Sequence, residues 1–145
     1  MIDLQINDYK FGERPTVTRP NMEFLQFLGE EGIRAMVSRH YDLMRQSPIK
    51  KLFPSEDAEF EKAKLRSSDF MIQILGGPEH YNKNQGQPLL AKRHRPFTIT
   101  YAGRTVWLTC YKQALLETNA PEHLIQSFWD YINVFSIWMV NIPDK

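Results

Sequence analysis

From residue 22 onward, apolar residues recur at the three- and four-residue spacing of an amphipathic helix, and this periodicity leaves little room for any other structure. In the segment 30–47, the helical stripe consists of Ile33, Met36, Val37, His40, Tyr41 and Met44. No stretch combines strict alternation of apolar and polar residues with the turn residues that a sheet requires. The sequence therefore predicts an all-α protein.

Glycine and proline divide the helical region into segments. We expect a short helix from residue 22 that breaks at Gly29, and a tight turn over 48–54. Further helices are expected within 30–47, 55–75, 89–95, 100–119 and 120–141. Residues 78–88 are polar and punctuated by Gly and Pro, which predicts a loop long enough to serve a function. Residues 1–21 lack periodicity and form an expected extended arm, followed by one domain over 22–145.

Charge and cysteine content argue against several classes of function. The formal net charge of +1 gives no basis for a nucleic-acid or anionic-membrane partner. The longest charge-free stretch, Tyr131 to Pro143, is shorter than the ~20 residues of a membrane span. The single cysteine, Cys110, excludes an internal disulfide and a Cys-rich metal site, and no C-x-x-C-H motif could attach a c-type haem. The N-terminus has no apolar run of signal-peptide length, so we expect a cytoplasmic protein.

Three residues near the middle of the predicted apolar stripes are not aliphatic. Tyr41 and Trp107 each bring a hydrogen-bond donor to an inward face. Ser67, one turn after the small residue Ala63, leaves space that a leucine would close. Each residue alone is compatible with ordinary core packing, but together they describe an apolar chamber with converging donors, which is typical of a pocket for a small ligand.

The stretch "LLAKRHRPF" places His94 between Arg93 and Arg95. Two fixed positive charges disfavour the imidazolium, so they bias the ring toward the neutral form that binds metals. The alternative is a basic turn at the surface. An imidazole opposite a donor-lined chamber suggests a flat cofactor between the two.

These residues stand in an ordered set of motifs, "EEGIRAMVSRHYDLM", "LGGPEHYNKNQGQPLLAKRHRPF" and "VWLTCYKQAL", that resembles the truncated haemoglobins, most closely their group II. The resemblance covers roughly residues 22–141. It implies a truncated globin-like 2-over-2 helical sandwich that encloses one non-covalent haem b.

The resemblance also assigns roles within that fold. His94 matches the proximal iron ligand, and Tyr41 and Trp107 match the distal residues that act on bound ligand. The residues expected to contact the cofactor are Phe53, Ala63, Arg66, Ser67, Phe70, Tyr81, Arg93, His94, Phe97 and Trp107. Many group II members carry tyrosine at the Phe53 position, so a second phenol donor is missing here.

The implied function is binding of dioxygen, nitric oxide or carbon monoxide, in oxygen transport or in peroxide and reactive-nitrogen chemistry. Peroxidase-like or nitric-oxide dioxygenase activity would need an external electron donor, because no reductase domain is fused. A haem-free helical interaction or sensor domain of globin shape is the alternative, and the oligomeric state is open. His40 is either a sixth iron ligand of the ferric state or an imidazole on the helix surface, and we place His80 and His123 at the surface.

Overall fold

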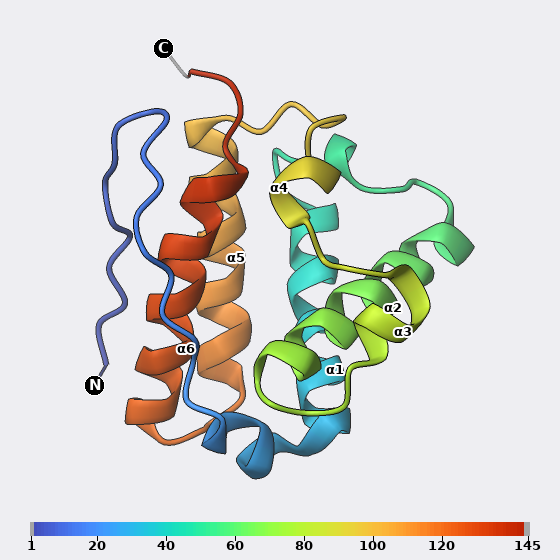
Figure 1. Cartoon of the computed structure of the whole chain (residues 1–145), viewed down its shortest axis with the longest axis vertical. Helices are drawn as coiled ribbons and strands as arrows, with labels where there is room; N and C mark the ends of the chain where they lie inside the picture. Colours follow the sequence, from blue (N-terminus) through green and yellow to red (C-terminus); the bar gives the residue numbers. More distant parts are fainter. Residues whose placement is uncertain (1, 144–145) are drawn as a thin grey trace.

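The computed structural model describes residues 2–143, and within that range every regular element is helical. The elements are α1 (Glu23–Arg45), η1 (Lys50–Leu52), α2 (Asp57–Ile74), α3 (His80–Gln85), α4 (Leu90–Arg93), α5 (Tyr101–Glu117), α6 (Glu122–Phe135) and η2 (Ser136–Met139). The pair α1 and α2 packs beside the pair α5 and α6 (Figure 1). None of the helices between residues 2 and 143 is long and apolar enough to cross a membrane.

Two glycines set the geometry of the α1–α2 pair. Gly29 adopts φ 72°, outside the helical region, so the helix from Glu23 kinks where the sequence predicts a break. After α2, Gly76 adopts φ 90°, and the Gly77 and Gly76 amides donate to the Ile72 carbonyl (2.9 Å) and the Gln73 carbonyl (3.1 Å). This pattern is a Schellman motif, which ends the helix and turns the chain.

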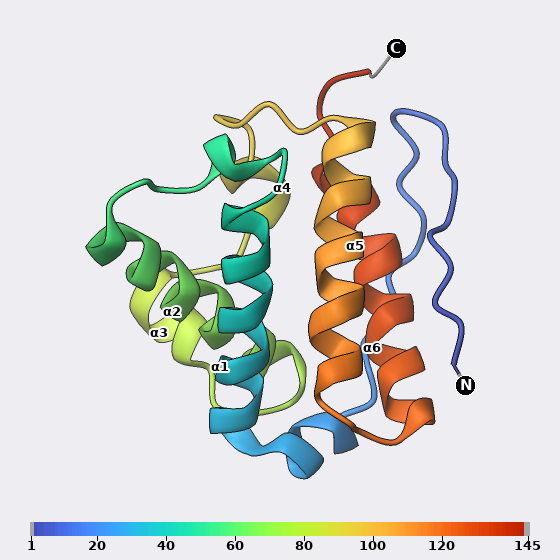
Figure 2. The ribbon, with the colours of Figure 1, turned by 180° about the vertical axis from the view of Figure 1, so that it is seen from behind.

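Aromatic side chains join the two helix pairs. Phe128 of α6 is fully buried, and its ring lies 5.2 Å from that of Phe24 in α1 and 5.7 Å from that of Tyr111 in α5. Seen from behind, α1 runs beside α5 (Figure 2), so the shared core lies between the pairs. Truncating such a ring to alanine typically costs about 3–5 kcal/mol of stability, so Phe128 contributes strongly to the core that joins the layers.

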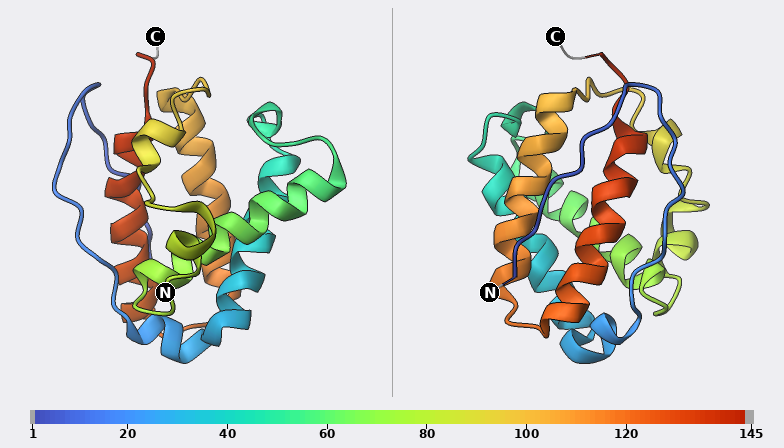
Figure 3. Two further views of the ribbon diagram at one scale, coloured as in Figure 1. Left: turned by 45° about the vertical axis from the view of Figure 1, so that its right-hand side comes forward. Right: turned by 90° about the vertical axis from the view of Figure 1, so that its left-hand side faces the viewer.

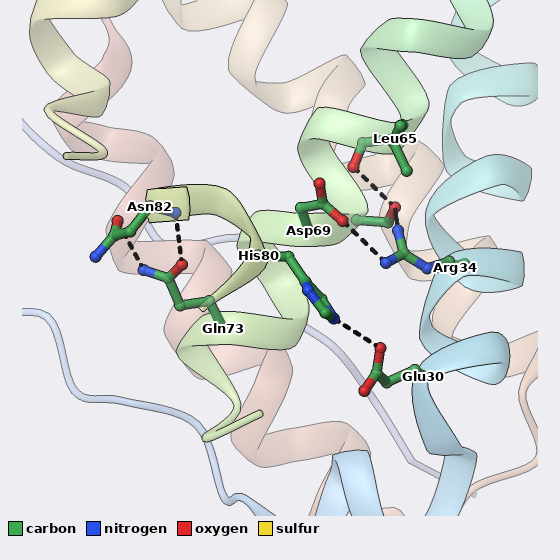
Figure 4. Close-up of polar contacts among 8 residues, drawn as sticks. Glu30, Arg34, Leu65, Asp69, Gln73, His80 and Asn82 are labelled. Carbon is green, nitrogen blue, oxygen red and sulfur yellow. Dashed lines mark hydrogen bonds and ion pairs between the residues drawn. The ribbon is translucent and has the colours of Figure 1, made fainter. Parts of the chain in front are cut away.

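The prediction of a structureless loop over 78–88 is wrong, because α3 forms inside it. The Gln73 side chain of α2 accepts from the Asn82 backbone amide (3.0 Å) and donates to the Asn82 side chain (3.0 Å), as Figure 4 shows. His80 Nε2 lies 3.0 Å from the Glu30 carboxylate of α1. These partners lie outside the segment, so local polarity could not reveal the helix.

The N-terminal arm contains no helix between residues 2 and 21 and packs along the outer side of α5 and α6 (Figure 3). Leu4 is buried, and the Gln5 carbonyl accepts from Trp129 Nε1 (2.8 Å) and Asn133 Nδ2 (2.7 Å). The Asn7 amide donates to Asn133 Oδ1 (3.0 Å), so one amide side chain of α6 pairs with the arm as a neighbouring strand would.

Candidate functional site: a cavity between the two helix pairs

A cavity of about 660 Å³ lies among η1, α2, α4, α5 and the end of α6. The sequence predicts eleven site residues, and the structure places every one of them in its wall. They are Tyr41, Phe53, Ala63, Arg66, Ser67, Phe70, Tyr81, Arg93, His94, Phe97 and Trp107. Ala63 and Ser67 line the cavity, where their small side chains were expected to leave space. The expected chamber is therefore present.

His94 caps the C-terminal end of α4 and faces the cavity. Its Nδ1 lies 2.6 Å from the Leu90 carbonyl oxygen. A carbonyl only accepts hydrogen bonds, so Nδ1 must carry a proton, and in the neutral tautomer that this contact selects Nε2 keeps its lone pair. This is the arrangement that orients a histidine for metal coordination.

The loop after His94 is held by Asn141, beyond η2. The Asn141 side chain accepts from the Ile99 amide (3.0 Å) and donates to the Phe97 carbonyl (2.8 Å), while its backbone amide donates to the Ile99 carbonyl (3.0 Å). Sequence reasoning missed this residue, because its partners lie some forty residues away and no local pattern marks it.

Arg93, expected to contact the cofactor, also organises the chain before α4. Its Nε donates to the Pro88 carbonyl (2.7 Å), and its Nη2 donates to the carbonyls of Gln85 (2.7 Å) and Gln87 (2.8 Å). Nη1 takes no part in these bonds. The guanidinium lies 5.6 Å from the Tyr81 ring, so Arg93 fixes the loop and still borders the cavity.

The donors on the other side stand on long helices. Tyr41 of α1 lies among aromatic rings, with Phe53 at 5.4 Å and Phe60 at 5.8 Å. Burial raises the pKa of the Tyr41 phenol, opposed by a hydrogen bond with Ser67 and by the positive charge of Arg66, so the hydroxyl stays protonated and able to donate. Trp107 also lines the cavity, and no residue within 2–143 accepts a hydrogen bond from its indole N–H.

The expectation that His40 lies at the helix surface is wrong, because the residue is 1 % exposed. Its Nε2 lies 3.0 Å from the Trp107 carbonyl, and its ring stacks on Tyr111 at 3.7 Å. Burial lowers the pKa of His40 to about 3, so the ring is neutral. It does not line the cavity, and its position favours a supporting role behind Trp107 over iron ligation.

Arg104 is a wall residue that the prediction missed. It is 2 % exposed and donates to Ser136 Oγ (2.9 Å), to the Asn133 carbonyl (2.7 Å) and to the Asn7 carbonyl of the arm (2.9 Å). The spacing to Leu108 and Tyr111 places it on the buried face of α5, which is the signal that could have found it. Burial lowers the pKa of this guanidinium, yet an arginine remains charged at neutral pH.

A second unpredicted polar cluster fixes the register of α2 against α1 (Figure 4). Arg34 donates to Ser68 Oγ (2.8 Å) and pairs with the Asp69 carboxylate (2.9 Å), and both acceptors are buried. Because Ser68 and Asp69 turn toward α1, Ser67 is left to face the cavity. Nothing in the local sequence distinguishes these residues from solvated ones.

The cavity wall is mostly apolar, and its charged side chains are all positive. It contains the four cations Lys51, Arg66, Arg93 and Arg104 and no aspartate or glutamate. Within residues 2–143 no group of three or more His, Cys, Asp or Glu side chains could hold a metal ion by itself. The wall therefore fits a largely apolar ligand with negative groups, and any metal must bring most of its own ligands.

Comparison with known proteins agrees with this geometry. The bacterial-like globin family matches residues 24–141. The group 2 truncated hemoglobin YjbI of Bacillus subtilis is 30% identical over 115 residues, which cover 79% of this chain and 85% of that protein.

Two solved structures extend the likeness to the fold. The crystal structure of phosphate-bound Hell's gate globin IV superposes with a TM-score of 0.89 at 32% identity, covering 96% of this chain and 87% of that one. The truncated oxygen-avid haemoglobin of Bacillus subtilis superposes with a TM-score of 0.75 at 29% identity, covering 81% of this chain and 98% of that one. The fold is the two-over-two helical sandwich of truncated globins, and the chain belongs to the bacterial-like globin family.

Proposed function

We propose that this protein is a haem b protein that binds dioxygen and other small ligands in the cavity. The observation that carries the proposal is the placement of His94. Its Nδ1 is bonded to the Leu90 carbonyl, so the neutral ring offers the Nε2 lone pair, and the ring borders a large cavity that Tyr41 and Trp107 also line. A histidine with that tautomer is the commonest axial ligand of haem in globins.

The wall fits haem in shape and charge. Haem is a flat apolar ring with two carboxylates, and it would meet aromatic side chains such as Phe70 and Tyr81, whose rings lie edge to face at 5.7 Å. Arg66 and Lys51, which both line the cavity, are suited to the carboxylates, since guanidinium and ammonium groups pair with them directly. The cofactor would be held without a covalent link, because the chain has no C-x-x-C-H motif.

The iron of a bound haem would supply the site at which a small ligand binds reversibly. This chain supplies the surroundings. His94 would hold the cofactor on one side, and on the other Tyr41 and Trp107 would donate hydrogen bonds to a ligand that carries partial negative charge. Each such bond stabilises a charged acceptor by about 1.5–3 kcal/mol. Dioxygen, which is more polar when bound than carbon monoxide, gains more from them.

The relatives support the choice of ligand. The Bacillus subtilis structure is described as oxygen-avid, and a protonated phenol with an indole N–H in one pocket is suited to retain dioxygen. The same donors would polarise nitric-oxide-derived or peroxide ligands. Turnover of those ligands requires an electron donor outside this chain.

Titration of the purified protein with hemin tests the proposal. We expect an intense Soret band that saturates at one haem per chain, and slow dioxygen release that accelerates about tenfold in Tyr41→Phe as one charge-assisted bond is lost. His123→Ala, at an exposed position, is the matched control and should behave as the wild type. A protein that remains colourless with excess hemin would show that the cavity serves another ligand.

A further inference from the structure

The wall residues that are also exposed to solvent mark the mouth of the cavity. They are Lys51, Arg66, Arg93 and Phe97. The mouth therefore consists of one aromatic ring bordered by three positive charges. Lys51 lies in η1, which follows α1, whereas Arg93 ends α4 and Phe97 lies in the loop after it.

Positive charge continues outward from this mouth. Neither of the segments that carry most of it, 43–54 and 80–116, contains a single aspartate or glutamate. Lys50, Lys92 and Arg95 are exposed there and lie outside the cavity wall. At the start of α2, the Asp57 carboxylate is already paired with Arg45 at 2.9 Å. Exposed cations of the two segments therefore adjoin the mouth cations Lys51 and Arg93 along the chain, in a protein whose formal net charge is only +1.

The loops that flank α4 also expose apolar side chains on a rigid backbone. Leu89 is 54% exposed and adopts φ 41°, a left-handed conformation that costs a non-glycine residue on the order of 1 kcal/mol. Phe97 is 46% exposed. The Arg93 bonds to the carbonyls of Gln87 and Pro88 hold the preceding loop in place. Exposed apolar residues bordered by charge on a pre-formed loop are typical of a protein interface.

We propose that this mouth is the docking surface for an acidic electron-carrier protein. The inference rests on the proposed haem function. The partner, a protein with a reduced flavin or iron–sulfur centre, would lose one electron, and a ferric haem in the cavity would gain it and become ferrous. Opposite charges on the two surfaces steer such an encounter and orient the partner over the opening.

Neither the haem carboxylates nor an anionic membrane accounts for the whole of this surface. The two carboxylates of a haem would neutralise at most two of the mouth cations, and Lys50, Lys92 and Arg95 lie beyond the cavity wall. An anionic membrane would need a longer apolar face, because α4 has only four residues and the exposed apolar groups there are Leu89 and Phe97.

The test uses an oxidised plant-type ferredoxin, an acidic iron–sulfur protein, as the probe. Its binding to the holoprotein is measured by calorimetry at about 20 mM and about 200 mM salt, a range over which exposed charges become screened. The variant carries Lys50→Glu, Lys92→Glu and Arg95→Glu. A control with the same change in charge carries Lys10→Glu, Arg14→Glu and Lys62→Glu, at exposed positions outside the cavity wall and outside both segments.

We expect the wild type to bind at low salt. The dissociation constant of the mouth variant should be at least about tenfold higher, and that of the control should stay within about threefold of the wild-type value. Reduction of the haem by reduced ferredoxin should slow in the mouth variant alone, while reduction by dithionite should stay unchanged in all three proteins. Absence of binding at low salt, equal binding by the mouth variant, or binding of phosphatidylserine vesicles in place of ferredoxin would overturn the proposal. Failure to take up haem would instead reject the proposed function. The Soret band reports haem uptake, so this outcome is distinguished from a loss of ferredoxin binding.

Discussion

The two sides of the cavity are built in different ways. Tyr41, Ser67 and Trp107 stand on α1, α2 and α5, each at least seventeen residues long, and their positions follow from helix packing. His94 instead ends a helix of four residues and begins a loop. Packing fixes one side, and polar contacts between side chains and backbone fix the other.

The polar side depends on a few residues that each make several bonds. Asn141 makes three well-formed hydrogen bonds to the loop after His94, and Arg93 makes three to the loop before it. A packed side chain contributes through many weak contacts, and neighbouring groups can replace some of them. A residue that makes several hydrogen bonds, such as Asn141 or Arg93, loses all of those bonds in one substitution. The comparison therefore predicts that a substitution has a large effect where one side chain makes several bonds, and a small effect where packing alone holds the side chain.

The largest effect is expected at Arg104, a buried side chain that makes several hydrogen bonds. Arg104→Met leaves the acceptors of Ser136, Asn133 and the arm without their donor, so the free energy of unfolding should fall by about 3 kcal/mol or more. Urea unfolding measures the change. Arg14→Met, at an exposed position in the arm, is the control and should alter stability by less than about 1 kcal/mol. Equal losses in both variants would show that the buried network contributes little.

A pH effect of similar size is expected from His40, on the packed side. The pKa of His40 is lowered to about 3 in the folded protein, whereas an unfolded histidine binds a proton near 6.5. Below pH 6.5 the unfolded state binds a proton that the folded state does not. The free energy of unfolding should therefore fall by up to about 1.4 kcal/mol per pH unit until the pH approaches 3.

His40→Phe keeps the aromatic packing and removes the titrating group. Its stability should lack this slope, although its absolute stability is lower because the bond to the Trp107 carbonyl is lost. Chemical denaturation at several pH values compares the two proteins. Identical slopes between pH 6 and 4 would mean that another group controls the acid response.

An intermediate effect is expected at Asn141. Asn141→Ala removes three side-chain bonds, to the Ile99 amide and to the carbonyls of Phe97 and His94, and the unfolding free energy should fall by about 1–2 kcal/mol. If His94 holds a haem as proposed, the haem should also dissociate faster, because the loop that follows His94 is less well held. Asn84→Ala, exposed on α3, is the matched control. Unchanged haem loss in Asn141→Ala would show that α4 alone positions His94.

Much of this fold and most of the site could be predicted from the sequence, and what was missed shares one cause. Helical spacing identified the long helices, and the motifs identified eleven wall residues, since both signals are local. Arg104 was missed because a charged residue is assigned to solvent unless its partners are known. Its partners belong to the arm and α6. The same reasoning applies to α3, whose contacts are with α1 and α2.

The smallest effect is expected at Ser67, on the packed side. Ser67→Ala removes the hydrogen bond with Tyr41 but leaves the phenol between its aromatic neighbours. Dioxygen release should change by less than about fivefold, which corresponds to one ordinary hydrogen bond of about 1 kcal/mol. Stopped-flow displacement by carbon monoxide measures the rate. A change as large as that of Tyr41→Phe would mean that Ser67, and not packing, positions the donor.

The central claim is that His94 holds a haem through the nitrogen that its hydrogen bond to Leu90 leaves free. The most direct measurement is the resonance Raman spectrum of the ferrous protein, which reports the iron–histidine bond, in wild type, in His94→Gly and in His94→Gly with added imidazole. We predict that the band is present in the wild type, absent in the variant, and restored by imidazole that enters the vacated space. An iron–histidine band that persists in His94→Gly without imidazole would contradict the account.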